Sequence, residues 1–193
     1  MTGGEYANLI ACYVSKRFGS RGLKVYREIH VGKTIIGKNR RIDVFVVCEP
    51  TNQAFAIECK FQDSEGTVDE KIPYTLDDLE AMPMAGCIAY AGKGFSAGVL
   101  HMLRASTLAA YCLPVADQGD TTADTKELDH LLAMHFGWWD LFVGKRKPVS
   151  ATSATTGSTG SASTGSLDLA DNLLNDGSGL VFQHHRGRAR DGH

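Results

Sequence analysis

Long apolar runs are absent from this sequence. No stretch approaches the ~18 consecutive apolar residues that a membrane span needs, and the opening MTGGEYANLI lacks the basic start and apolar core of a secretory signal. The five cysteines form no C-x-x-C pair, which argues against a zinc ribbon or a thioredoxin-type site. We therefore expect a cytoplasmic protein with no membrane association, whose cysteines are small buried side chains in a reducing compartment.

A strong charge of one sign is also missing. The formal net charge is −2, so the chain as a whole is not a polycation. Binding to nucleic acid would then require a local basic surface. Two short clusters are candidates, one made of Lys33, Lys38, Arg40 and Arg41 and one within residues 186–190. Each cluster can also be explained as ordinary solvated surface.

The first 62 residues have the pattern of a helix followed by three strands. Tyr6, Leu9, Ile10, Tyr13 and Val14 recur at the spacing of one helical face, which predicts a helix over residues 5–18. Alternation and turn residues predict strands at 24–31, 41–48 and 55–62, joined by short loops. Such short connections favour antiparallel neighbours.

Helices and strands alternate after residue 62. Capping pairs at Thr67/Glu70 and Thr75/Asp78, with Pro73 between them, predict two short helical pieces over residues 67–83. Further strands are predicted at 87–91 and 111–115, and further helices at 96–110 and 128–143. This order predicts an α/β fold with a mixed sheet flanked by helices.

The composition changes near residue 147. Residues 150–166 are almost entirely Ser, Thr, Ala and Gly, and too few apolar side chains are present to offset the entropy of ordering them. We expect one folded domain over residues 1–147. Residues 148–193 are expected to be a disordered linker and basic tail.

The stretch AFAIECKFQ, residues 54–62, places charge on an apolar strand. Because strand side chains alternate, Glu58, Lys60 and Gln62 share one face, and Asp43 on the preceding strand can approach Glu58. The alternatives are a surface ion pair between Glu58 and Lys60, and a salt bridge from Asp43 to Arg40 or Arg41.

Two neighbouring carboxylates repel each other, and a divalent cation relieves that repulsion. Asp43, Glu58 and the backbone carbonyl of Cys59 form an oxygen ligand set that suits Mg²⁺, with Mn²⁺ as a possible substitute. Lys60 would orient or activate a water molecule, or stabilise charge on a phosphate oxygen. Together these groups predict a site for phosphodiester hydrolysis.

Asp43 followed by Glu58-Cys59-Lys60 resembles the D…(D/E)-x-K signature of the PD-(D/E)XK nuclease superfamily, over about residues 3–115. Ile42 stands where that family often has a proline. The resemblance implies a restriction-endonuclease-like α/β/α fold. It also implies that Glu5 supports the metal site, with Glu28 as a rival, and that Gln62 contacts the site or the DNA. Glu5 could instead be an ordinary helix N-terminal acid, and Gln62 a strand-end polar residue.

Further candidate contacts to DNA are Lys71, Lys93 and Ser96, the last two beside a helix start that could hold phosphate. For Lys93 and Ser96, a turn and helix-capping role is the alternative. The leading hypothesis is a Mg²⁺-dependent DNA endonuclease of restriction or phage type, acting on DNA, with a homodimer as a possible form. The alternatives are a Holliday-junction-resolvase-like nuclease and a non-catalytic nuclease-fold module that binds DNA.

Overall fold

The computed structural model describes residues 1–64, 66 and 68–149. Thr67, residues 150–166 and the basic cluster within 186–190 lie outside the described residues, as do the predictions made for them. Met1–Lys147 form one compact unit. The chain begins with α1 (Gly3–Phe18), and a single 3-10 turn (Gly19–Arg21) leads from it into the first strand.

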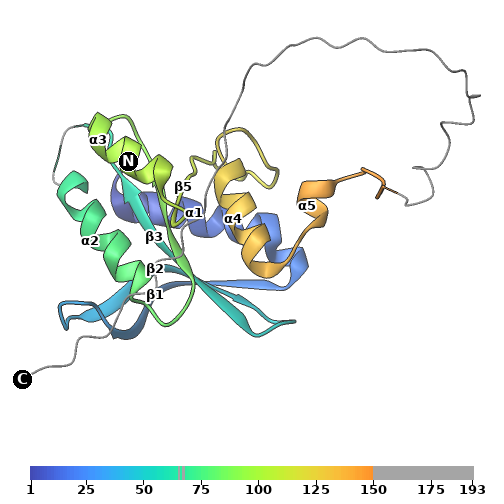
Figure 1. The fold of residues 1–193 in the computed structure, drawn as a ribbon, viewed down its shortest axis with the longest axis horizontal. Helices are drawn as coiled ribbons and strands as arrows, with labels where there is room; N and C mark the ends of the chain where they lie inside the picture. Colours follow the sequence, from blue (N-terminus) through green and yellow to red (C-terminus); the bar gives the residue numbers. More distant parts are fainter. Residues whose placement is uncertain (65, 67, 150–193) are drawn as a thin grey trace, which may run out of the picture. The chain divides into compact units, whose positions relative to one another are not determined.

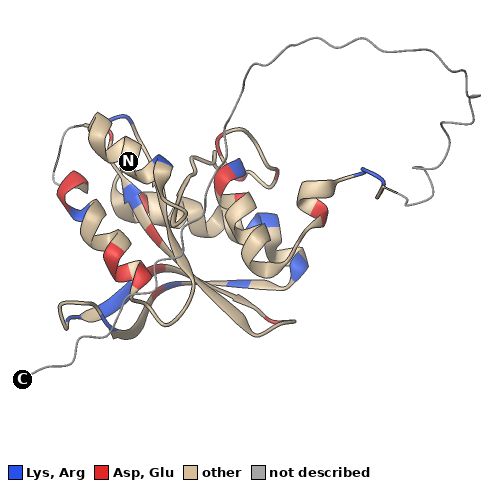
Figure 2. Cartoon of the chain, viewed as in Figure 1, with Lys and Arg blue, Asp and Glu red and all other residues tan. Residues whose placement is uncertain are grey.

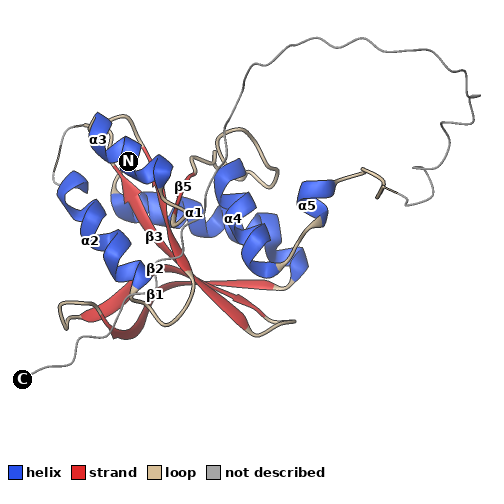
Figure 3. Cartoon of the chain, viewed as in Figure 1, coloured by secondary structure: helices blue, strands red, loops and turns tan. Residues whose placement is uncertain are grey.

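Five strands form one mixed sheet in the order in which they occur along the chain (Figure 3). They are β1 (Leu23–Lys33), β2 (Asn39–Cys48), β3 (Gln53–Phe61), β4 (Gly86–Ala91) and β5 (Ala109–Tyr111). The first three pair antiparallel through short turns, as the sequence predicts. β4 and β5 then add in parallel, each after a helical crossover. β3 therefore lies at the centre of the sheet.

Two helical layers cover the two faces of the sheet (Figure 1). One core joins Tyr6, Ile10 and Val14 of α1 with Leu128 and Leu132 of α4 (Lys126–Phe136), against the odd-numbered residues of β3. The other core joins α2 (Val68–Glu80) and α3 (Ala97–Ala105), against the opposite face. The α/β/α architecture predicted from the sequence is confirmed.

Four elements differ from their predicted bounds. Residues 68–80 form one helix with Pro73 inside it, not two pieces. The buried Ile72 and Leu79 lie on one side of α2, so packing on the sheet outweighs the backbone hydrogen bond that proline removes. The Thr75 hydroxyl donates to the Lys71 carbonyl at 2.8 Å within the same helix.

The last strand lies earlier than predicted. β5 ends at Tyr111, because the Leu113 amide donates to the Asp124 carbonyl and Pro114 has no N–H to offer. α3 accordingly stops at Ala105, short of the predicted residue 110. The predicted helix over 128–143 is two helices, α4 and α5 (Asp140–Val143), because Gly137 takes the left-handed conformation that ends helices. No helix in the described ranges is long and apolar enough to cross a membrane.

Candidate active site

Glu58 and Lys60 project from the central strand onto the face covered by α2 and α3. The Lys60 Nζ lies 3.3 Å from Glu58 Oε2, and the two side chains are only 18% and 16% exposed. A pair in this position is not the surface ion pair of an edge strand, which was the alternative explanation. Holding these charges in a largely buried place costs folding free energy.

Asp43 replaces a piece of the β2–β3 ladder with its side chain. The last regular pair of that ladder is Val44 with Ile57, and one residue further Asp43 Oδ2 accepts the Cys59 N–H at 2.9 Å. The Asp43 backbone carbonyl accepts the Arg27 Nε–H at 2.8 Å. The carboxylate is therefore fixed beside Glu58 by contacts to both neighbouring strands.

The backbone is irregular at the same place on the other side of β2. Glu28, opposite Asp43, has no regular pairing, although its neighbours Arg27 and Ile29 do. Its φ is 57°, a left-handed conformation that a non-glycine residue adopts at a cost. The Glu28 carboxylate lies 3.8 Å from Arg41 in an exposed ion pair. The irregularity of β1 therefore lies directly opposite Asp43.

The backbone carbonyl of Cys59 points toward β2, on the side of the Asp43 carboxylate. The amides of Ala56 and Gln62 donate toward β4, to Ala85 and Ala91. Since successive peptide groups of a strand point in alternate directions, the N–H and C=O of Cys59 both point toward β2. The N–H is taken by Asp43. The carbonyl oxygen lies beyond the last regular β2–β3 pair, on the side where Asp43 and Glu58 meet.

The surroundings of Glu58 contain too little positive charge to balance its carboxylate and that of Asp43. Burial raises the pKa of Glu58 to about 6, Lys60 opposes this rise, and the like charge of Asp43 adds to it. One ammonium therefore does not compensate two carboxylates and their burial. A divalent cation is the chemical group that would.

The donor set fits a cation that keeps part of its water shell. Among the described residues no group of three or more His, Cys, Asp and Glu side chains is placed to hold a metal ion. Two carboxylates and one carbonyl are present instead, and Mg²⁺ is commonly held by one or two carboxylates plus waters and substrate phosphate. Asp43, Glu58 and the Cys59 carbonyl are the residues that would hold it.

Glu5 has another role in this structure. Its carboxylate accepts the Thr2 N–H at 2.7 Å, while Thr2 Oγ1 accepts the Glu5 N–H at 3.2 Å. This capping box begins α1, and the hydrogen bonds to Thr2 lower the pKa of Glu5. Neither Glu5 nor its rival Glu28 is joined to Asp43 or Glu58 by a hydrogen bond in the described chain, and a metal-supporting role for Glu5 stays a prediction.

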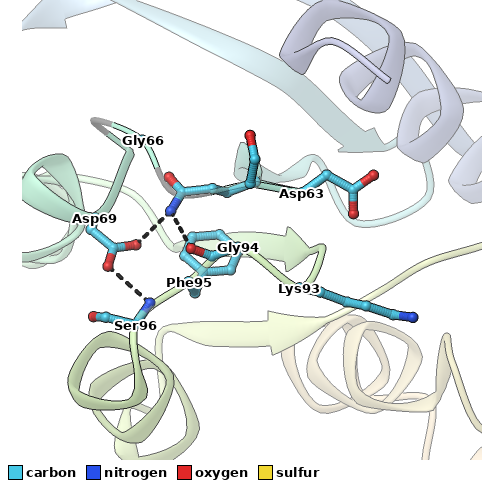
Figure 4. A pocket seen from close by; sticks show the side chains of 9 residues that line it. Asp63, Gly66, Asp69, Lys93, Gly94, Phe95 and Ser96 are labelled. Atoms are coloured by element: carbon cyan, nitrogen blue, oxygen red, sulfur yellow. Dashed lines mark hydrogen bonds between the residues drawn. The ribbon is translucent and has the colours of Figure 1, made fainter.

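Gln62 is a buried structural link. Its side-chain amide donates to Asp69 Oδ1 at 3.0 Å and to the Gly94 carbonyl at 2.7 Å, and its Oε1 accepts the Val68 N–H at 3.1 Å. Figure 4 shows the bonds to Asp69 and Gly94, beside a cavity of about 460 Å³. A side chain at Gly92, which has a φ of 110°, would collide with the Gln62 backbone. With both amide atoms occupied, Gln62 positions the loop after β3, and its contact to substrate stays a prediction.

The start of α3 is already occupied by a carboxylate. Asp69 Oδ2 accepts the Ser96 N–H at 2.9 Å, and the Ser96 hydroxyl caps Val99. The Ser96 hydrogen bonds lower the pKa of Asp69, so an anion is held there by the protein itself. In Figure 4 the Lys93 side chain extends away from Asp69. The structure therefore gives Ser96 a capping role, and its predicted part in holding phosphate stays a prediction.

Arg40 differs from the other predicted DNA contacts. It is 5% exposed, and its guanidinium binds Asp78 of α2 through two bonds of 2.9 and 2.8 Å. Figure 2 shows the basic β1–β2 hairpin next to the acidic end of α2. Arg40 is thus a buried link between hairpin and helix, and its predicted contact to phosphate stays a prediction. Lys33, Lys38, Arg41, Lys71 and Lys93 are exposed.

Sequence reasoning missed Arg27 and Asp69. Arg27 holds the Asp43 carbonyl and also hydrogen-bonds Asn8 of α1, and Asp69 joins Gln62 to the start of α3. Both act across distances in sequence that no local pattern encodes. An arginine among the alternating residues of β1 and an acid in the first turn of α2 look ordinary on their own.

The domain is thus an α/β/α fold in which β2 and the central strand β3 bring two acids and a lysine together. The chain belongs to the PD-(D/E)XK nuclease superfamily: the family model described as "PD-(D/E)XK nuclease superfamily domain" matches residues 2–139. The match includes every residue of the candidate site. Nucleases of this superfamily act on nucleic acids and typically use divalent metal ions.

Other comparisons are sparse. No curated protein matches the chain. A solved structure titled "Crystal Structure of Protein of Unknown Function AF1548" is 16% identical, with a TM-score of 0.35. The alignment covers 51% of this chain and 53% of that one, so the chain spans about half the length of this structure.

Proposed function

We propose that this protein is a Mg²⁺-dependent endonuclease that hydrolyses phosphodiester bonds in DNA, with Mn²⁺ as a substitute ion. The observation that carries the proposal is the meeting of Asp43, Glu58 and Lys60 on adjacent strands, with Asp43 bound to the Cys59 amide and Glu58 3.3 Å from Lys60. A purely structural site would have little reason to keep these buried charges together.

The chain's own groups divide the work. When bound, the cation would supply Lewis-acid stabilisation of phosphate charge and a more acidic water. Asp43 and Glu58 offer the oxygen ligands, and the Cys59 N–H fixes the rotamer of Asp43. Lys60 lies on the same face as Glu58, where its ammonium positions the attacking water or balances charge on a phosphate oxygen.

A cleavage assay tests this proposal. Purified protein is incubated with supercoiled plasmid, linear duplex, single-stranded and four-way-junction DNA, with Mg²⁺ or with EDTA. We expect Mg²⁺-dependent nicking or linearisation of duplex DNA. Preferential cutting of the junction would indicate a resolvase-like enzyme instead. Binding of DNA without cleavage of any form in Mg²⁺ or Mn²⁺ would contradict the proposal and indicate a non-catalytic module.

The assay also bears on assembly and location. One Asp43–Glu58–Lys60 cluster cuts one strand, so double-strand cleavage would require two copies, and we propose a homodimer on duplex DNA. An order in enzyme concentration near two for linearisation would support it. We also propose a cytoplasmic location, which the free state of all five cysteines supports.

The β1–β2 hairpin is the proposed contact to the DNA backbone. Its exposed cations Lys33, Lys38 and Arg41 have no acidic residue between them in sequence, and Arg40 and Asp78 fix the hairpin near the site. We expect Lys38→Ala to weaken DNA binding several-fold and to reduce the slope of log affinity against log salt by about 0.9. Fluorescence anisotropy in EDTA over a series of salt concentrations measures both.

Lys24 provides the matched control for Lys38. It is an exposed lysine on β1 at the end opposite the hairpin, with Glu49 3.7 Å away. Lys24→Ala should leave affinity and salt slope unchanged. Equal effects of the two substitutions would show that the hairpin has no special part in DNA binding.

A further inference from the structure

A second cavity lies at the carboxyl ends of the parallel strands. Its volume is about 470 Å³. The lining residues come from β4, the turn after it, α3, β5 and the start of α4: Tyr90, Gly92, Lys93, Leu100, Arg104, Tyr111 and Glu127. Carboxyl ends of parallel strands are where α/β proteins commonly bind ligands. Of these residues only Gly92 and Lys93 entered the description of the site above.

Strand register connects this cavity to the catalytic lysine. Lys60 is directly paired with Tyr90 in the β3–β4 ladder, and Tyr90 with Tyr111 in the β4–β5 ladder. Paired residues of adjacent strands share a face of the sheet, and strands are about 4.8 Å apart, so the Cα of Tyr111 lies about 10 Å from that of Lys60. A DNA strand whose phosphate lies at Lys60 would therefore bring a neighbouring nucleotide over the cavity.

Aromatic rings form the floor of the cavity. The Tyr90 and Tyr111 rings are edge to face, with centroids 5.8 Å apart at 72°. Tyr90 is also held edge to face by Phe95, at 6.2 Å and 89°. Tyr90 is buried while Tyr111 remains half-buried. A tyrosine ring fixed by a second ring is a stacking platform for a base, with little side-chain entropy left to lose.

Positively and negatively charged side chains lie around the rings. The Glu127 Oε2 accepts the Tyr111 N–H at 2.6 Å, which holds the carboxylate at the edge of β5. Arg104 and Glu127 line the cavity together with Tyr90. Burial raises the pKa of Tyr90, with Glu127 adding to the rise and Arg104 opposing it. Lys93 adds a second exposed cation. An aromatic floor, cations and one carboxylate match a base edge joined to a phosphate.

We infer that this cavity is a nucleotide-binding subsite, which receives a nucleotide of the substrate strand adjacent to the scissile phosphate. The base stacks on Tyr111, Arg104 and Lys93 bind a flanking phosphate, and Glu127 accepts a hydrogen bond from the base. The inference rests on the proposed function, because it places the scissile phosphate at Lys60. It adds the part of the substrate that the metal site does not contact.

Binding of single nucleotides tests the subsite without any cleavage. The full chain in EDTA is titrated with 5′-deoxynucleoside monophosphates, followed by calorimetry and by amide NMR shifts. Deoxynucleosides and inorganic phosphate form separate arms. We expect saturable binding of the monophosphates, with shifts at Leu100 and Tyr111. Arg104→Ala should weaken it about tenfold or more, the loss of a charge-assisted hydrogen bond.

Two further variants keep the test sharp. Arg146→Ala removes an exposed arginine outside the cavity and should bind nucleotides as the wild type does. Leu100→Trp fills the cavity without removing a polar group and should abolish binding, with circular dichroism confirming the fold. Wild-type affinity in both Arg104→Ala and Leu100→Trp would overturn the inference. So would phosphate alone binding as tightly as the nucleotides.

The two proposals fail independently. If the protein binds nucleotides in this cavity but cuts no DNA, the subsite is supported and the nuclease function is contradicted. If it cuts DNA but shows no nucleotide-dependent shifts at Leu100 and Tyr111, the nuclease function is supported and the subsite is contradicted. If both hold, Arg104→Ala should raise the KM for DNA cleavage about tenfold with little change in kcat.

Discussion

Glu58→Gln is expected to abolish cleavage and, at the same time, to make the folded domain more stable at neutral pH. Glutamine keeps the shape of the side chain but removes a negative oxygen ligand, so the bound cation and its contribution to catalysis are lost. We expect cleavage to fall at least about a thousandfold, equivalent to about 4 kcal/mol of transition-state stabilisation. The measurement is the initial rate of plasmid nicking in Mg²⁺.

The gain in stability follows from the pKa of Glu58. The pKa rises from 4.5 to about 6 on folding, chiefly through burial. The folded state therefore binds this proton more tightly than the unfolded state. Stability from this group is fully present below pH 4.5 and is lost as the pH rises through 6. The loss amounts to about 2 kcal/mol at neutral pH.

Glu58→Gln avoids that loss, so the difference between variant and wild type should be near zero at pH 4 and grow to about 2 kcal/mol by pH 8. Urea unfolding in EDTA at several pH values measures it. Glu49→Gln is the control, since Glu49 is exposed and lies 3.7 Å from an equally exposed Lys24. Glu49→Gln should alter neither cleavage nor stability appreciably. A Glu58→Gln variant that is less stable than wild type at pH 8, or that still cuts DNA, would contradict this account.

The fold was predictable where pattern and burial agree. Residues 55–62 alternate between apolar and polar, and the structure has β3 at the centre of the sheet with one face fully packed. The antiparallel meander follows from the short turns. Pro73 was misleading because local rules treat it as a helix end, whereas the apolar side of α2 packs on the sheet and keeps the helix continuous. Tertiary burial decided that case, and no local window contains it.

The site was predictable only in part, for a similar reason. Period-two alternation is enough to place Glu58 and Lys60 on one face, and the hairpin brings Asp43 beside them. The Asp43–Cys59 hydrogen bond depends on where the β2–β3 ladder stops, which the sequence does not mark. The roles of Gln62 and Arg40 depend on Asp69 and Asp78 of α2, partners whose distance in space no spacing rule gives.

Arg40→Ala is expected to destabilise the domain by about 3–5 kcal/mol, because it leaves the Asp78 carboxylate buried without its partner. Asp78 is only 13% exposed and makes two contacts of 2.9 and 2.8 Å to the guanidinium. The hydrogen bonds to Arg40 lower the pKa of Asp78, so the ion pair is present at neutral pH and weakens in acid as Asp78 takes up its proton. Denaturant unfolding at pH 7 measures the loss.

The neighbouring residue supplies the control. Arg41 is 56% exposed and 3.8 Å from an equally exposed Glu28, so Arg41→Ala should cost less than about 1 kcal/mol in stability. When both variants are folded, Arg41→Ala should weaken DNA binding more than Arg40→Ala does, since Arg41 faces solvent and Arg40 faces α2. The two neighbouring arginines then have separate functions: Arg40 stabilises the fold, and Arg41 contacts DNA. Equal stabilities of the two variants would remove the basis for assigning Arg40 to the fold.

Asp78 has a second hydrogen-bond partner, which allows the contribution of its ion pair with Arg40 to be measured separately. Asp78 also accepts the Ile35 amide at 2.8 Å, so one carboxylate ties β2 and the turn of the hairpin to α2. Asp78→Asn can retain the hydrogen bond to Ile35 while losing the negative charge that pairs with Arg40. In a double-mutant cycle with Arg40→Ala, the Asp78→Asn change should therefore cost much less in the Arg40→Ala background than in the wild type. Because Asp43 lies three residues after Arg40 on the same strand, loosening this tie should also lower cleavage. Additive stability losses would show that the hairpin is positioned by other contacts.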